Sequence, residues 1–393
     1  MDLFETYKSS VEYPKSIISM GLYPYFHSLE SAQDTEVIME GRNTIMLGSN
    51  NYLGLTNDPR TIAAAHKALD KYGTGCSGSR FLNGTLDLHI ELEKELAEFF
   101  HKEAAMTFST GFQTNLGVVS ALATRHTVIL HDNENHASLF DASRLSFARH
   151  VYKYEHNNME ELEDKLARLP FETPKLIITD GVFSMSGDIA NLPEIIRLKK
   201  KYNARIMVDD AHGVGMIGNC GRGTASYYDL EDETDIIMTT FSKSLASLGG
   251  CVVASEDVIF YLKHASRPFI FSASIPPANA ATALEALRIL KSSPDRVAAL
   301  NEIADYMRMK LKENNIPILD GNTAIIPIIT KDFVRTLTIG KRLLQEGVYV
   351  NPVLPPAVPD DMCLLRTSYT ATHTKEQMDR AAAIITRVFN EID

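Results

Sequence analysis

Most features that mark a specialised class of protein are missing from this sequence of 393 residues. Tryptophan is absent, and the four cysteines stand far apart, without a CxxC pair or a His/Cys spacing typical of metal ligands. We therefore expect no metal site and no disulfide framework, and reduced thiols are typical of a cytoplasmic protein. A formal net charge of -11 argues against a nucleic-acid partner, because such proteins carry basic patches.

Membrane-spanning and secretory segments are also missing. No apolar run approaches the roughly 20 residues that a bilayer requires. The N-terminus does not show a charged leader followed by an apolar core. A lipid substrate would therefore be met from solution or through peripheral contact with a membrane surface.

What is present is an ordinary globular composition, with 45% hydrophobic and 23% charged residues. In the middle of the chain, short apolar runs alternate with helical periodicity, and polar or glycine-rich turns follow the runs. This alternation is typical of an α/β fold with a mainly parallel sheet. The expected strands cover residues 105–108, 127–130, 176–179, 205–208, 236–239 and 251–254.

The length exceeds what one hydrophobic core usually serves, so we expect two packed domains. The pattern changes after Pro276 and Pro277, where two long helical stretches lead into an apolar strand over 324–329. We predict an N-terminal arm over residues 1–56, a large domain over 57–280 and a smaller α+β C-terminal domain over 281–393.

Two segments match the pattern GxGxxG, and neither has the context of a dinucleotide site. The segment 73–78 follows a helix, whose expected N-cap is Asp58, and not a strand. The segment 213–218 follows a strand but runs into further glycines, which do not open the required helix. A nicotinamide-dependent dehydrogenase is therefore a distant alternative.

Lys243 stands at the end of an apolar run, between hydroxyl residues and before two glycines. Burial lowers the pKa of a lysine and makes its amine a nucleophile that forms Schiff bases. The flanking hydroxyls suit the phosphate of a cofactor. A solvated surface lysine is the plainer interpretation of this residue taken alone.

Further polar residues follow other expected strands. Asp209 follows the strand over 205–208, where a carboxylate directed into a covered site would hold a protonated ring nitrogen. His136 follows the strand over 127–130 and would stack on a planar cofactor. The alternatives are a turn aspartate and a structural histidine.

The stretch from Ser109 to Asn115 follows a strand and starts a helix, which predicts either an anion site or plain N-capping by Ser109 or Thr110. Ser184 adds a serine at another strand end. Arg366 lies among apolar neighbours and needs an anionic partner, either a substrate carboxylate or an internal acid.

Taken together, these segments resemble the α-oxoamine synthases, pyridoxal phosphate enzymes of fold type I. The likeness covers nearly the whole chain and is strongest for the bacterial serine palmitoyltransferase branch of that family. The segments that carry it are 51–55, 78–85, 109–111, 136–138, 183–185, 209–213, 240–244 and 355–359. The resemblance implies a large domain with a mainly parallel seven-stranded sheet and a smaller C-terminal domain.

The resemblance also assigns roles within the site. It implies that Lys243 holds pyridoxal 5'-phosphate as a Schiff base and that Asp209 pairs with the pyridine nitrogen. His136 would stack on the ring, and Ser184 and His212 would contact its phenolic oxygen. Lysine, aspartate and the two histidines form the implied catalytic set.

Other residues would hold the phosphate and the substrate. The implied phosphate ligands are Gly111, Phe112, Thr240 and, across a homodimer with shared active sites, Ser272 of the partner subunit. Arg366 would hold the amino-acid carboxylate, and Asn51 would lie near the substrate. The implied reaction is a decarboxylative condensation of a small L-amino acid with a long-chain thioester of coenzyme A or an acyl-carrier protein.

Four positions depart from the family pattern and leave the amino acid open. Ser186 replaces a residue that is often acidic, Val358 replaces a threonine, and Tyr369 and Thr370 add hydroxyls. Serine would give a sphingolipid-type 3-keto base, and L-cysteate would give a capnine-type sulfonolipid base. A non-catalytic subunit with the pyridoxal fold is a further alternative, which the intact lysine, aspartate and histidine set disfavours.

Overall fold

The computed structural model describes residues 2–355, 357–359 and 361–392. Pro356, within the predicted 355–359 segment, lies outside the described residues. The chain divides into a larger unit, Asn50–Asn301, and a smaller unit that joins Met1–Ser49 to Glu302–Asp393. None of the described helices is long and apolar enough to cross a membrane.

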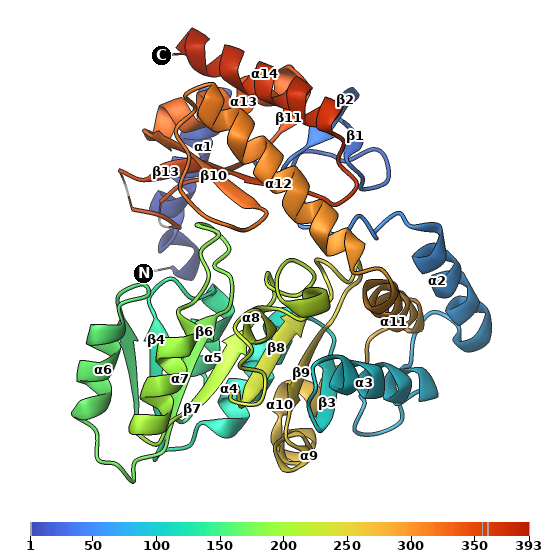
Figure 1. The fold of residues 1–393 in the computed structure, drawn as a ribbon, viewed down its shortest axis with the longest axis vertical. Helices are drawn as coiled ribbons and strands as arrows, with labels where there is room; N and C mark the ends of the chain where they lie inside the picture. Colours follow the sequence, from blue (N-terminus) through green and yellow to red (C-terminus); the bar gives the residue numbers. More distant parts are fainter. Residues whose placement is uncertain (1, 356, 360, 393) are drawn as a thin grey trace. The chain divides into compact units, whose positions relative to one another are not determined.

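The larger unit is built on a seven-stranded sheet with the order β3-β9-β8-β7-β6-β4-β5 (Figure 1). Neighbouring strands from β5 to β8 run parallel, and β9 runs antiparallel to both β8 and β3. The prediction of a mainly parallel sheet is therefore confirmed. The strands are β3 (Ala104–Phe108), β4 (Val128–Asp132), β5 (His150–Tyr154), β6 (Lys175–Asp180), β7 (Arg205–Asp209), β8 (Ile236–Thr240) and β9 (Gly250–Ala254).

Six of these strands were predicted, and β5 was not. Its sequence His-Val-Tyr-Lys-Tyr lacks the apolar run of its neighbours, and only Tyr154 is buried. The reason is its place at the edge of the sheet, where it pairs with β4 alone. An edge strand is less covered than a central one, so apolar content is a weak signal for it.

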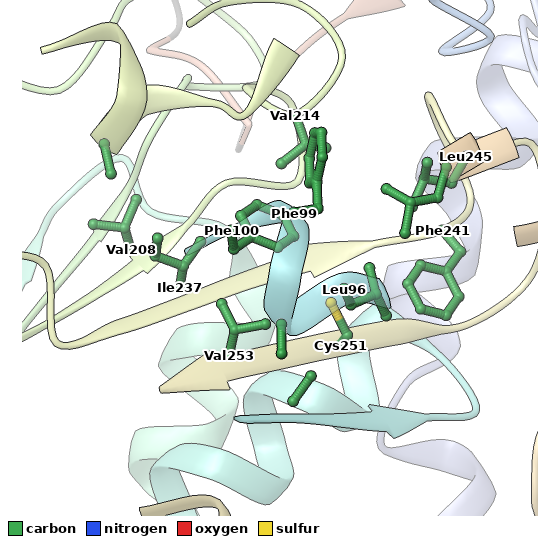
Figure 2. Close-up of a cluster of buried hydrophobic side chains, with 14 of the residues drawn as sticks. Leu96, Phe99, Phe100, Val208, Val214, Ile237, Phe241, Leu245, Cys251 and Val253 are labelled. Atoms are coloured by element: carbon green, nitrogen blue, oxygen red, sulfur yellow. The ribbon is translucent and has the colours of Figure 1, made fainter. Parts of the chain in front are cut away.

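Both faces of this sheet are covered, because alternate residues of each strand point to opposite sides. Ile206 and Val208 of β7 belong to one apolar cluster, whereas Met207 between them belongs to another. The first cluster includes residues of α3, α6, α7 and α11, and the second includes residues of α4, α5, α9 and α10. Figure 2 shows the first cluster, where Leu96 and Phe99 of α3 lie over the central strands.

The helices of the larger unit begin and end at the expected signals. Asp58 caps α2 by accepting a hydrogen bond from the Arg60 amide, Pro59 is the first helical residue, and Gly73 ends the helix at a φ of 75°. The helices are α2 (Pro59–Tyr72), α3 (Asp87–Phe99), α4 (Gly111–Leu122), α5 (Ala137–Arg144), α6 (Met159–Ala167), α7 (Leu192–Lys201), α8 (Thr224–Tyr227), α9 (Glu256–Ala265), α10 (Arg267–Ile270) and α11 (Pro277–Ser292).

The smaller unit contains two three-stranded sheets, β1-β2-β11 and β10-β13-β12. Helix α12 (Asp295–Glu313) contains the boundary between the units. The other elements are η1 (Leu3–Glu5), α1 (Lys8–Ser19), β1 (Glu36–Met39), β2 (Arg42–Met46), β10 (Ile325–Lys331), α13 (Phe333–Gln345), β11 (Val348–Tyr349), β12 (Asn351–Val353), β13 (Cys363–Ser368) and α14 (Lys375–Ile392).

These boundaries differ from the predicted ones in two places. The N-terminal residues are part of the smaller unit, because β2 pairs with β11 through Ile45 and Val348, and Tyr13 packs against Phe333 with ring centroids 5.8 Å apart. The predicted boundary at 280/281 falls inside α11, whose apolar residues belong to the core of the larger unit. Helical periodicity does not reveal which of two cores a helix joins.

Candidate active site

A cavity of about 290 Å³ lies at the carboxyl ends of the parallel strands in the larger unit. In open α/β sheets this edge is where ligands bind, because the loops that leave the strands surround it. The lining residues are Thr110, Gly111, Phe112, Asn115, His136, Ser138, Asp180, Val182, Asp209, Ala211, His212, Met238, Thr240, Ser242 and Lys243. Seven predicted site residues, from segments far apart in the sequence, are thus brought together.

Lys243 reaches this cavity from the loop that follows β8. The hydroxyl of Thr240 donates to the Gly249 carbonyl at 3.0 Å and accepts from the Ser242 amide at 3.3 Å, which closes the loop. Ser244, the next residue along, donates to the Val214 carbonyl at 2.7 Å. These bonds restrict the backbone on both sides of the lysine.

Asp209 ends β7 and is 4% exposed. Asn115 of α4 donates from Nδ2 to Asp209 Oδ2 at 2.6 Å, and the Ala211 amide donates to Oδ1 at 3.1 Å. Asn115 also donates to the Ser138 hydroxyl at 2.8 Å. Hydrogen bonds from neutral donors stabilise the charged form of a carboxylate and fix its direction. No role was predicted for Asn115, although it stands one helical turn after Gly111.

His136 caps α5, and its ring is held by two bonds to Ser138. Its Nδ1 lies 2.7 Å from the Ser138 hydroxyl and accepts from the Ser138 amide at 3.3 Å. A nitrogen that accepts an amide bond carries no proton, so Nε2 carries the proton of the neutral ring. Burial lowers the pKa of His136, which favours that neutral form.

Asp180, at the end of β6, is a second buried carboxyl group in the cavity. It accepts from the His136 amide at 3.2 Å. Burial, together with the neighbouring charge of Asp209, raises the pKa of Asp180 well above its ordinary value. Two carboxyl groups that share one enclosed space do not both ionise readily, so the proton is held by Asp180. No role was predicted for Asp180.

His212 follows β7 and is positioned by a tyrosine. The hydroxyl of Tyr52 lies 2.7 Å from His212 Nδ1, and the tyrosine is fully buried. Tyr52 also donates to Asn50 Oδ1 at 3.2 Å. Tyr52 lies in the 51–55 segment, and no role was predicted for it.

The start of α4 is the stretch for which the sequence predicts an anion site or plain N-capping. Thr110 is the N-cap, since its hydroxyl accepts from the Gln113 amide at 3.1 Å, so one of the two expected capping residues is identified. The first-turn amides of Gly111 and Phe112 have no carbonyl partner inside the helix. A Cβ at Gly111 would come within 2.9 Å of Thr240, so glycine is needed for this close approach. Amides at a helix start bind phosphate.

Four predicted site residues do not line the cavity. Ser184 lies in the turn after β6, and Ser272 accepts a hydrogen bond from Gln113 Nε2 at 3.2 Å. Asn51 uses its side-chain oxygen to accept from the Leu55 amide at 3.1 Å. Arg366 is a 5% exposed residue of β13 in the smaller unit. Their roles stay predictions.

The comparisons with known proteins agree on one family. The aminotransferase class I and II family model matches residues 42–385. The serine palmitoyltransferase of Sphingobacterium spiritivorum is 52% identical over 375 residues, which cover 95% of this chain and 94% of the relative. The serine palmitoyltransferase of Bacteroides ovatus is 49% identical over the full length of both chains.

A solved structure described as SPT with a PLP internal aldimine superposes with a TM-score of 0.97 at 35% identity, over 100% of this chain and 99% of that one. The chain belongs to the α-oxoamine synthase family. It is accordingly an acyltransferase of that type, and its cofactor is pyridoxal phosphate.

The residues of the cavity fit this cofactor. The amides of Gly111 and Phe112 would hold its phosphate, Asp209 its ring nitrogen, and Lys243 its aldehyde carbon. Among the described residues, the buried Oδ1 of Asn115 has no hydrogen-bond partner, which is consistent with a site that a further group completes. No cluster of metal-ligating side chains occurs in the described part of the chain.

Proposed function

We propose that this enzyme condenses L-serine with a long-chain acyl thioester and releases carbon dioxide, giving a 3-keto long-chain base for sphingolipid-type lipids. The observation that carries the proposal is the cavity that joins Lys243, Asp209 and His136 at one sheet edge. The choice of serine is supported by relatives at 52% and 49% identity that are both named serine palmitoyltransferase.

Three groups, the cofactor, Asp209 and Lys243, carry the chemical steps of the proposed reaction. Pyridoxal phosphate supplies an electron sink for the negative charge that develops at Cα of the bound amino acid. Asp209 would face the ring nitrogen of the cofactor and favour a proton there, and Asn115 and the Ala211 amide fix the direction of its carboxylate. Lys243 would take the Cα proton, so that Cα forms a bond to the acyl carbon while the bond from that carbon to sulfur breaks and the thiolate leaves. The carboxylate is then lost as carbon dioxide, and the electron pair left at Cα takes up a proton, which Lys243 would return.

Other residues orient the reactants. His136 lines the cavity, where its ring would stack on the cofactor, and its Nδ1 is engaged by Ser138. His212 is aimed by Tyr52 and donates or accepts one hydrogen bond in the cavity. Arg366 is assigned to the substrate carboxylate, which is the anion that its guanidinium would pair with in a bidentate manner.

The contacts at two departing positions favour serine over cysteate. A sulfonate needs additional donors, but the hydroxyl of Tyr369 is paired with Thr367 Oγ1 at 2.9 Å and the residue is fully buried. Ser186 accepts from the Asp188 amide at 3.3 Å and so closes a turn. These groups serve the fold and add little to a site for a second anion.

A titration with four amino acids tests the choice of substrate. The purified holoenzyme is mixed with serine, cysteate, glycine or alanine while its visible spectrum is recorded, and the products with acyl-coenzyme A and acyl-carrier protein are then identified by mass spectrometry. We expect the largest spectral change and a 3-keto amine with serine. A larger response and turnover with cysteate would move the assignment to sulfonolipid synthesis. No product with any amino acid would indicate a non-catalytic subunit.

Two substitutions test the roles of individual residues. Lys243→Ala is expected to abolish turnover and the visible absorbance of the bound cofactor, and an unchanged spectrum would end that assignment.

Arg366→Ala is expected to weaken binding of the amino acid while the cofactor stays bound. Normal affinity for serine in this variant would contradict the role of Arg366.

We further propose that the enzyme acts as a homodimer in the cytoplasm and meets its acyl donor at, or close to, a membrane surface. Ser272 of the partner subunit would complete the phosphate site.

A further inference from the structure

His156 is a mostly buried histidine outside the cavity whose ring contacts carboxylates from two different loops. It lies just after β5, and its side chain is 19% exposed. Its Nδ1 is 3.1 Å from Asp132 Oδ1, and its Nε2 is 3.3 Å from Asp188 Oδ2. Glu134 Oε2 lies 3.8 Å from Nδ1. A ring whose two nitrogens both face carboxylates donates from both, which requires the imidazolium form.

The two loops carry residues of the active site. Asp132 ends β4 and starts the turn to His136, and its Oδ1 also accepts from the Glu134 amide at 3.0 Å. Asp188 closes the turn that contains Ser184, because its carbonyl accepts from the Phe183 amide at 2.9 Å. One imidazolium therefore lies between the turn of His136 and the turn of Ser184.

Asn157, the residue after His156, also links the loop of Asp132 to the chain just after Asp188. The Asn157 amide donates to Asp132 Oδ2 at 2.9 Å, and Asn157 Nδ2 donates to the Ile189 carbonyl at 3.3 Å. Its side-chain oxygen accepts from the Asn191 amide at 3.1 Å. The backbone φ of Asn157 is 50°, in the left-handed region that asparagine tolerates better than most residues.

The surroundings of the ring favour the charged form. The Phe183 ring lies edge-on to the imidazole, with centroids 4.3 Å apart at 82°, and shields it from water. Burial alone opposes the charge, but the hydrogen bonds to Asp132 and Asp188 outweigh it and raise the pKa of His156 to about 10. The ionisable groups that face the ring are Asp132, Glu134 and Asp188.

We propose that His156 is a positioning residue that fastens the His136 turn to the Ser184 turn and thereby sets both side chains for the cofactor. The inference rests on the proposed cofactor contacts of His136 and Ser184. An imidazolium suits this task because it donates along two fixed directions in one plane. An asparagine side chain at this position would donate to one of the two carboxylates at most and, being neutral, would leave both without their charge partner.

The first test is the affinity of the apoprotein for pyridoxal phosphate, measured by titration without substrate. His156→Asn is expected to weaken binding by about 10- to 100-fold, by analogy with the loss of an outer partner of a metal ligand. The control is His101→Asn, a histidine of the same unit that is 55% exposed and lies 3.7 Å from Glu231. We expect the control to bind the cofactor as the unchanged protein does.

The second variant, Asp188→Asn, removes one carboxylate that contacts His156 and leaves the imidazole ring in place. Asp188 is 41% exposed at its side chain, so Asp188→Asn should fold normally. With one carboxylate fewer, the pKa of His156 falls. His156 stays charged up to about pH 9 in the unchanged protein, so the loss of cofactor affinity that follows its deprotonation should begin at lower pH in Asp188→Asn than in the unchanged protein.

Two results would overturn the inference. One is an unaltered affinity and pH profile in Asp188→Asn. The other is a His156→Asn protein that melts at a lower temperature but binds pyridoxal phosphate as tightly as the control, which would give His156 a purely structural role. Neither measurement needs an amino acid or an acyl donor, so a wrong substrate assignment would leave their outcome unchanged.

Discussion

At the scale of single residues, Asp209 depends on a partner that makes no assigned contact with substrate. Asn115 donates to its carboxylate at 2.6 Å from a different element, and both residues are almost fully buried. A hydrogen bond to a charged, buried acceptor is worth more than one between neutral groups at the surface. The direction in which Asp209 points is therefore set by α4 as much as by β7.

Asn115→Ala should weaken the binding of pyridoxal phosphate. The lost bond is worth roughly 1.5–3 kcal/mol, which corresponds to about 10- to 100-fold in affinity. The measurement is a fluorescence or absorbance titration of the apoprotein. Asn314→Ala, an exposed asparagine of the smaller unit, serves as the control. Equal affinities in the two variants would show that Asp209 does not need this partner.

At the scale of elements, the loop after β7 closes around Asp210. This carboxyl group is fully buried and accepts from the Thr224 amide and hydroxyl at 2.6 and 2.7 Å. Burial outweighs these two bonds and raises the pKa of Asp210 to about 7. A Cβ at Gly213 would lie 1.9 Å from Asp210 Oδ1, so this glycine is required for the close approach that gives the loop its path to His212.

Gly213→Ala should destabilise the protein by roughly 1–3 kcal/mol or more, since the added methyl group must displace a buried, hydrogen-bonded carboxyl group. Urea unfolding monitored by circular dichroism measures the change. Gly75→Ala is the matched control, because nothing lies within 4 Å of a Cβ at that position and its φ is ordinary. An equal midpoint for both variants would contradict the predicted close contact.

A second element-scale feature is the buried ion pair that ties the 78–85 segment to α3 and β3. Arg80 Nη1 lies 2.7 Å from Glu93 Oε1, with side chains 7% and 8% exposed, and it also donates to the Thr107 hydroxyl at 2.9 Å. Burial would raise the pKa of Glu93, but Arg80 outweighs it and the pKa is lowered. This stabilisation is present above the unfolded pKa of about 4.3 and is lost as the pH falls through the lower folded value.

Arg80→Ala should cost about 3–5 kcal/mol of stability, because it leaves Glu93 charged and buried beside Thr107 without its main partner. Thermal melting at neutral pH is the measurement. Lys94→Ala removes an exposed lysine from the same helix, 3.9 Å from Glu98, and should change stability by at most about 0.5 kcal/mol. A small effect of the arginine substitution would mean that the segment is held mainly by its backbone contacts.

At the scale of the whole molecule, the larger unit exposes large apolar side chains that a lone chain would leave in water. Leu82, Phe147 and Phe271 are 76%, 79% and 77% exposed. Phe271 stands next to Ser272, the residue assigned to the neighbouring site of a dimer. Exposed apolar side chains near functional residues are typical of protein interfaces. A second copy of this chain is the partner that the proposed shared sites require.

Light scattering should give twice the chain mass for the purified protein. Phe271→Asp should shift it towards the monomer and lower turnover, since a charge buried in an interface needs a partner. Phe171→Asp is the control, because that phenylalanine is 58% exposed on the loop before β6, at the opposite end of the strand from the cavity. A monomeric protein with full activity would refute the shared-site proposal.

The sequence by itself determined what short-range patterns encode. Buried strands appear in the sequence as apolar runs, and caps such as Asp58 and Thr110 mark the starts of helices. Six of the seven strands of the large sheet were therefore predictable, and so were the lysine, aspartate and histidine that follow three of them. The carboxyl ends of parallel strands meet at one edge of the sheet, so residues that follow such strands in the sequence could be predicted to share one site.

Only the tertiary structure decided which distant side chains meet. Asn115 bonds to Asp209 across 94 positions of sequence, and Tyr52 contacts His212 across 160. His156 contacts Asp132 and Asp188, which are 24 and 32 positions away from it. Tertiary contacts also place α11 in the larger unit and the N-terminal residues in the smaller one. The physical reason is that these contacts depend on how elements pack, and no local periodicity records the partner that a side chain will find.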